Sequence, residues 1–206
     1  MRIIREACVE TKKEIDSAYA KNAERIELCS HLDRGGYTPT PSLVKYSTSF
    51  KNSNVLIMIR RKDDNFVTNK KDMAKLIKDI KAFAKSKIKG YVFGLLTKEN
   101  KVDVENMKKL MSYVPANKYV VFHMAFDLIE DKKEAIDQLT QLEVRRILTK
   151  GGNDIAINNI KSLIALKKYA HEKIELVVGG KVSDDNYLII NKKTGINQFH
   201  GRKLAC

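Results

Sequence analysis

The chain has 206 residues, of which 43% are hydrophobic and 31% are charged, a composition typical of a globular protein and not of a disordered or fibrous one. Its formal net charge is +14, but the lysines are spread over the expected solvent faces of helices and do not form a block interleaved with aromatic residues. This distribution argues against a specific nucleic-acid partner.

Two further features bound the cellular context. No run of about 18 apolar residues occurs, so we expect no membrane span, and charged residues interrupt the apolar start of the chain, so we expect no signal peptide. The cysteines are too few, and odd in number, for a disulfide framework. They are Cys8, Cys29 and Cys206. These features predict a cytoplasmic protein with free thiols.

In chain order, short apolar runs typical of strands alternate with amphipathic stretches typical of helices. The strands expected in the first half are Ile3–Val9, Arg25–Cys29, Val55–Arg60 and Gly90–Leu96. The helices expected to follow them are Lys12–Asn22, Pro41 to about Phe50, Lys70–Lys87 and Val102–Tyr113. Thr11 and Glu14 have the spacing of a capping box for the first helix, and a charged loop is expected at Arg61–Thr68.

The alternation continues through the second half of the chain. The strands expected there are Tyr119–Phe126, Arg145–Lys150, Ile174–Val178 and Gln198–Lys203. A helix is expected at Asp131–Leu142. Two more are expected to begin at capping side chains, one at Asp154 running to about His171, and one at Ser183 or Asp184 running to about Lys193.

Eight strands and seven helices in strict alternation predict an α/β fold, in which residues 1–206 form a single TIM-type (β/α)8 barrel. An open doubly wound sheet is the alternative, but the first strand runs into Val9-Glu10-Thr11-Lys12 and not into a Gly-rich dinucleotide fingerprint. The chain ends directly after the eighth strand, so the eighth helix is expected to be missing or truncated. The bare flank that this would leave predicts a homodimer or a larger homo-oligomer.

The first two strands carry the same pair of chemical groups. Glu6 and Cys8 are two residues apart, as are Glu27 and Cys29, and side chains two apart share one face of a strand. Because the intervening Leu28 suits the helix-facing side of its strand, we expect both pairs to point into the barrel, side by side at its mouth.

Buried carboxyl groups need a partner, because a desolvated carboxylate is costly unless it meets a cation, a proton or a metal. Arg60, at the end of the third strand, is the expected cation for Glu6 and Glu27. A purely structural ion-pair network is the simpler interpretation of this set, and buried cysteines are often only small hydrophobic residues.

Other polar residues also fall at the carboxyl ends of strands, where barrel enzymes assemble their sites. His123 and Asp127 share one face at the end of the fifth strand, and His200 lies in the eighth. Gly179 and Gly180 follow the seventh strand, where backbone amides could hold a phosphate. One hypothesis is therefore an enzyme acting on a small phosphorylated or carboxylated metabolite. Its expected catalytic residues are Glu6, Glu27, Arg60, His123, Asp127 and His200.

Five segments resemble the CutC family of copper homeostasis proteins. They are Arg25-Ile-Glu-Leu-Cys29, Gly35-Gly-Tyr-Thr-Pro39, Ile57-Met-Ile-Arg60, Val121-Phe-His-Met-Ala-Phe-Asp127 and Arg146-Ile-Leu-Thr149. The resemblance extends from Glu6 to His200. It implies a β/α barrel, a cytoplasmic location, a role in copper tolerance, and Cu(I) bound as a ligand through the barrel cysteines Cys8 and Cys29.

The sequence departs from the family pattern in three places. Met124 stands where the family usually has Arg after His123, Gly201-Arg202-Lys203 replaces a Ser-rich stretch, and the C-terminal helical tail is missing. Thiolates suit Cu(I), but a set of Cys, His and Glu is also a fair set for Zn(II). The copper and enzyme hypotheses both remain open at this point.

Overall fold

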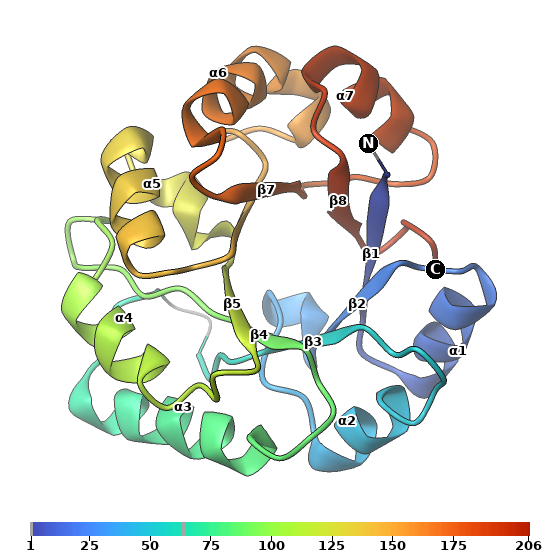
Figure 1. Ribbon diagram of the computed structural model, residues 1–206, viewed down its shortest axis with the longest axis vertical. Helices are drawn as coiled ribbons and strands as arrows, with labels where there is room; N and C mark the ends of the chain where they lie inside the picture. The colour runs from blue at the N-terminus through green and yellow to red at the C-terminus, as the bar shows by residue number, and fades with distance from the viewer. Residues whose placement is uncertain (1, 63–64) are drawn as a thin grey trace.

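The computed structural model, which describes residues 2–62 and 65–206, is a closed ring of parallel strands surrounded by helices (Figure 1). Each strand pairs with the next along the chain, and β8 returns to pair with β1. The strands are β1 Ile4–Val9, β2 Arg25–Leu28, β3 Val55–Met58, β4 Gly90–Val92, β5 Tyr119–Phe122, β6 Arg146–Thr149, β7 Glu175–Val178 and β8 Gln198–Gly201. The predicted TIM-type barrel is confirmed.

Seven α-helices within the described residues form the outer layer seen in Figure 1. They are α1 Lys12–Ala20, α2 Pro41–Ser47, α3 Lys70–Phe83, α4 Val104–Met111, α5 Lys132–Gln141, α6 Ile160–Ala170 and α7 Tyr187–Thr194. The predicted capping box is present at α1, where Thr11 and Glu14 each bond to the other's backbone amide. Asp63 and Asp64, in the expected charged loop, lie outside the described residues.

Several expected elements are longer than the observed ones, such as the fourth strand, which ends at Val92, and the third helix, which ends at Phe83. Three further differences concern local turns. The fifth strand ends at Phe122, and the 3-10 helix η2 Met124–Leu128 follows it. The helix expected from Asp154 begins only at Ile160, because the Asp154 carboxylate accepts hydrogen bonds from Ile155 and Asn158 in the preceding loop. A turn from Ser183 to Asn186 delays α7 in the same way.

Apolar side chains fill two compartments. The larger lies between the strands and the helices, and it contains alternate strand residues such as Ile26 and Leu28. The smaller lies inside the barrel and consists of side chains from the opposite face of the strands. Its buried members are Cys8, Cys29, Leu56, Met58, Val92, Val121, Leu148 and Val177. The two expected cysteines therefore do point into the barrel.

The flank beyond β8 is partly covered by the last residues of the chain, which run beside β1 (Figure 1). Leu204 and Ala205 are fully buried, and the Ala205 amide donates a hydrogen bond of 3.1 Å to the Asp184 carboxylate. No helix follows β8 in the described chain. The expectation of a bare flank is therefore corrected, because this short irregular segment packs there. Among the described residues, no helix is both long and apolar enough to cross a membrane.

Candidate functional site

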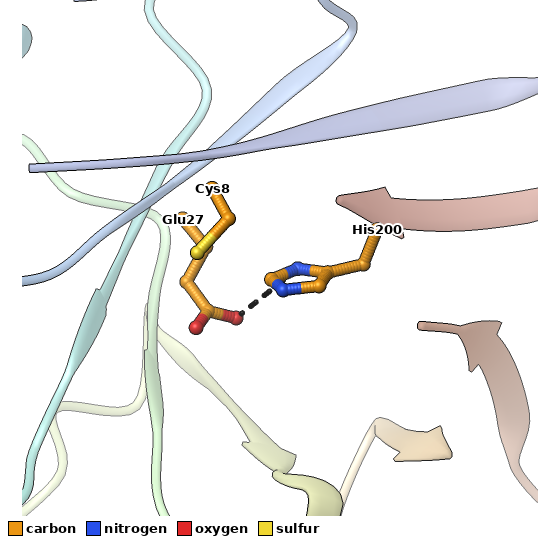
Figure 2. A group of neighbouring side chains, drawn as sticks. All are labelled: Cys8, Glu27 and His200. Carbon is orange, nitrogen blue, oxygen red and sulfur yellow. Dashed lines mark ion pairs between the residues drawn. The ribbon is translucent and has the colours of Figure 1, made fainter. Parts of the chain in front are cut away.

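The polar side chains inside the barrel gather on three neighbouring strands, β8, β1 and β2. Strand register sets Glu6 opposite Arg25 of β2 and His200 of β8, and it sets Cys8 opposite Glu27. All five side chains are buried. Figure 2 shows Cys8, Glu27 and His200 directed toward one another across this part of the interior.

Glu6 is a fully compensated anion. It accepts a hydrogen bond from Arg25 Nε, and its Oε1 lies 2.8 Å from His200 Nδ1. Burial alone would raise the pKa of Glu6, but Arg25 and His200 outweigh burial and lower the pKa to about 2. Glu6 is therefore ionised at neutral pH despite its depth in the barrel.

Glu27, on the next strand, lies in the opposite electrostatic situation. Its Oε1 accepts a long hydrogen bond of 3.6 Å from the Cys29 thiol, and its Oε2 lies 3.7 Å from His200 Nδ1. Burial raises the pKa of Glu27 to about 8, because the attraction of His200 does not offset desolvation and the nearby Cys8 and Glu6. Two neighbouring carboxyl groups thus hold different protonation states at neutral pH.

The two cysteines of this group are neighbours in the inner cluster of the barrel and influence each other. Cys29 is the main cause that lowers the pKa of Cys8 to about 6, against the effect of burial. Cys8, together with burial, raises the pKa of Cys29 well above its ordinary value. Burial would lower the pKa of His200, but Glu27, Cys8 and Glu6 together raise it above its ordinary value. Cys8 therefore carries the thiolate, beside an imidazolium.

A cavity of 270 Å³ opens at the barrel mouth above this group. Cys8, Glu27, Cys29 and His200 line it on the polar side. Apolar and thioether side chains line the cavity on the other side. Two basic side chains also line the cavity. These further lining residues include Met58, Met124, Leu148, Arg60 and Arg202. The cavity gives a small ion or molecule a route to both cysteines.

The expected cation for the buried carboxyl groups is corrected by the structure. Arg25 bonds to Glu6, whereas Arg60 donates hydrogen bonds of 3.0 and 3.2 Å to the backbone carbonyl groups of Arg34 and Gly36. The Arg60 guanidinium also lies over the Phe66 ring. Arg25 is two residues from Glu27, so its side chain lies on the same inward face of the strand, and the sequence already indicates this.

The fifth strand contributes differently from what its sequence pattern predicts. His123 lines the mouth cavity, but its Nδ1 accepts a hydrogen bond from the Ala125 amide, and burial together with Arg60 lowers its pKa to about 3. Asp127 lies away from the cavity and accepts hydrogen bonds from Thr149 and Lys150. Because η2 replaces extended chain after Phe122, alternation no longer applies, and Met124 enters the cavity instead of Asp127.

Gly179 and Gly180 lie at the carboxyl end of β7, next to the polar side. A Cβ added at Gly179 would lie 3.0 Å from Leu148 Cδ1 and 3.4 Å from the His200 ring, so Leu148 would have to shift slightly to admit a side chain. Gly180 has a φ of +86°, in the region that favours glycine. Their expected role in holding a phosphate stays a prediction.

A second polar layer closes the opposite, N-terminal end of the barrel, and sequence analysis did not identify it. Arg146 and Gln198 both donate to Glu175, at 2.7 and 2.6 Å, and Arg25 donates to Gln198 at 2.9 Å. Arg146, Glu175 and Gln198 are the first residues of β6, β7 and β8, at the end of the barrel where polar groups serve stability, and Arg25 links this layer to Glu6. Their inward parity was the only sequence signal.

Comparison with known proteins gives consistent matches over nearly the whole chain. The model of the CutC family matches residues 3–205. A CutC family protein from Aliivibrio fischeri is 32% identical over 201 residues, covering 97% of this chain and 81% of that protein. One from Streptococcus pyogenes is 32% identical over 211 residues, covering 98% of this chain and all of that protein.

Solved structures extend the comparison. A crystal structure from Streptococcus agalactiae, named as a copper homeostasis protein CutC, is 36% identical, has a TM-score of 0.91, and covers 98% of this chain and 99% of its own. An aldolase called QR15 has a TM-score of 0.70, with coverage of 97% and 91%, but is only 15% identical. The likeness to the aldolase shows the shared barrel fold alone.

Proposed function

Because the chain belongs to the CutC family, we propose that it acts in copper homeostasis by binding one Cu(I) ion between Cys8 and Cys29. The observation that supports this most directly is that both cysteines are buried in one cluster inside the barrel and line the same mouth cavity. Thiolates are soft ligands that favour Cu(I), and two of them satisfy its low coordination number.

The surroundings of the two cysteines fit a soft monovalent ion. The low pKa of Cys8 supplies one thiolate without a metal, and the Cys29 proton would be released on binding. Met58 and Leu148 make the neighbouring wall of the cavity apolar, which disfavours strongly hydrated ions. The Met124 thioether lines the same space.

A cytoplasmic location and self-association are part of the same proposal. Reducing conditions keep thiols free and keep copper as Cu(I), and the cytoplasm supplies them. Leu188 and Ile189 of α7 are each about half exposed, at 54% and 49%, which supports a homodimer that covers them. Light scattering should then give a dimer, and Leu188→Lys with Ile189→Lys should give a monomer.

The copper function is tested by titrating reduced, anaerobic protein against a competing Cu(I) chelator. We expect about one Cu(I) per chain in the wild type, and a loss of binding in Cys8→Ser with Cys29→Ser while circular dichroism stays unchanged. Cys206→Ser is the matched control, because this cysteine does not line the mouth cavity. Undiminished affinity in the double variant would contradict the proposal.

A second function is favoured by the difference between the two carboxyl groups. A protonated Glu27 beside an ionised Glu6 resembles the acid and base pair of an enzyme, and Arg60 and Arg202 could attract an anionic substrate to the cavity. We expect such a substrate to be a phosphorylated or carboxylated metabolite. A thermal-shift screen of these compounds tests this: a stabilising compound should lose its effect in Arg60→Ala, and an empty screen would remove the support.

A further inference from the structure

We propose that Cys8, Glu27 and His200 form a site for Zn(II), with three protein ligands and a fourth position open to the mouth cavity. The proposal goes beyond the copper function and does not depend on it. Because both sites use Cys8, the two metals should exclude each other.

Geometry is the first observation. One ligand atom from each of the three residues, a sulfur, a carboxylate oxygen and a ring nitrogen, lies within 4.8 Å of the other two. The residues come from β1, β2 and β8, which are neighbours in the closed barrel (Figure 2). Zinc bonds of about 2.0–2.3 Å place tetrahedral ligands roughly 3–4 Å apart, so small side-chain rotations would complete the site.

The second observation is an unsatisfied polar atom within this group. Glu27 is 2% exposed, and its Oε2 atom has no hydrogen-bond partner among the described residues. Its other oxygen accepts from Cys29. A buried polar atom without a partner is destabilising, so such atoms mark places where a ligand or ion belongs. A metal ion between Glu27, Cys8 and His200 would satisfy it.

The third observation is the support behind His200. Its Nδ1 is 2.8 Å from Glu6 Oε1, and Glu6 is in turn held by Arg25. This contact orients the imidazole, and a metal would bind it through the ring nitrogen that Glu6 does not hold. A carboxylate that accepts from the second ring nitrogen is the usual outer-shell partner of a metal-binding histidine. Glu6 is therefore a positioning residue for this site.

The donor set and the cavity together indicate zinc and an open site. One sulfur, one nitrogen and one oxygen suit a borderline ion, whereas Cu(I) prefers the two sulfur atoms of Cys8 and Cys29. Three protein ligands facing a cavity of 270 Å³ leave room for water or a small ligand at the fourth position, as in zinc sites that perform chemistry.

The test separates the two metals in one set of variants, each checked by circular dichroism. Zn(II) is titrated against a chelating dye, and Cu(I) is titrated in parallel. Glu27→Gln keeps the shape of the side chain, and we expect it to weaken Zn(II) by more than the about 10- to 100-fold that loss of an outer-shell partner causes, with Cu(I) affinity unchanged. Cys29→Ser should show the reverse, losing Cu(I) and retaining Zn(II).

Two further variants test His200. His200→Gln should weaken Zn(II) as Glu27→Gln does, and His171→Gln is the matched control at an exposed histidine. If His200→Gln does not fold, Glu27→Gln alone decides. Wild-type Zn(II) affinity in folded Glu27→Gln would overturn the proposal. A wild type that binds Zn(II) but no Cu(I) would contradict the copper function and leave the zinc site standing.

Co(II) substitution gives an independent reading of the ligands. We expect the intense visible bands of a four-coordinate site and a thiolate-to-Co(II) charge-transfer band, with the latter lost in Cys8→Ser and retained in Cys29→Ser. The weak spectrum of a six-coordinate ion in the wild type would overturn the proposal.

Discussion

The interior of this barrel has two sides. Both are formed by strands of the same closed sheet, but one carries mainly apolar side chains and the other carries polar ones. On strands β3 to β7 the inward layer is apolar, with Leu56, Val92, Val121, Leu148 and Val177 packed together. On β8, β1 and β2 the buried inward side chains nearer the mouth include two carboxyl groups, an imidazole and two thiols. Apolar packing alone would close the barrel equally well on both sides.

The apolar side stabilises the fold, and the polar side carries the groups that can bind a ligand. A side chain such as Leu56 stabilises the fold by leaving water, whereas a buried Glu must be compensated by partners and adds little net stability. Glu6 is compensated by Arg25 and His200, while Glu27 keeps its proton. The polar side is thus organised for ligands, with the apolar side as its rigid support.

We expect the largest effect on stability from removing one partner of the buried ion pair on the polar side. Arg25→Met leaves the Glu6 carboxylate in the barrel without its main cation, and we expect a loss of about 3–5 kcal/mol in the free energy of unfolding, measured with urea. Adding Glu6→Gln should recover part of this loss. Additive losses in the double variant would show that the two residues do not act as a pair.

The apolar side should respond through packing and leave metal binding intact. Leu56→Ala deletes a fully buried side chain and should cost about 2–5 kcal/mol of stability. Cu(I) affinity should remain within about twofold of wild type, because Leu56 belongs to the rigid support and does not line the mouth cavity. A large loss of copper affinity in the folded variant would mean that the two sides are not separable.

A pH series sharpens the distinction between the two carboxyl groups. The folded-state pKa of Glu27 is about 8, above that of an unfolded glutamate, so the unfolded chain loses this proton first and wild-type stability falls as pH rises from about 4.5 to 8. Glu27→Gln cannot titrate. It should match wild type near pH 4 and become more stable than wild type by about 1–2 kcal/mol at pH 8, because His200 shares part of the proton change. A constant difference between pH 4 and 8 would contradict this assignment.

How far the sequence could predict the site depends on whether the chain stays extended. The alternation of side chains along a strand correctly predicted that Glu27 and Cys29 point inward, because β2 is regular up to the mouth. It failed for Asp127, because η2 begins two residues after β5 ends. The partner of Glu6 could not be read from local pattern, because Arg25 and Arg60 both face inward and only the barrel register places Arg25 opposite Glu6.

The layer at the N-terminal end of the barrel was missed for a related reason. Arg146, Glu175 and Gln198 lie on three different strands, and nothing in the sequence near any one of them signals the others. The closed ring brings them together. Helix starts were predicted well where the cap is a neighbouring Thr, as at α1, and poorly where loop side chains form their own turns, as before α6.

Copper K-edge X-ray absorption of protein loaded anaerobically with one Cu(I) per chain tests whether the polar side binds Cu(I) through Cys8 and Cys29. We expect an edge typical of Cu(I) and two sulfur ligands, reduced to at most one in Cys29→Ser. A first shell made only of nitrogen or oxygen, or a spectrum unchanged in Cys29→Ser, would contradict it.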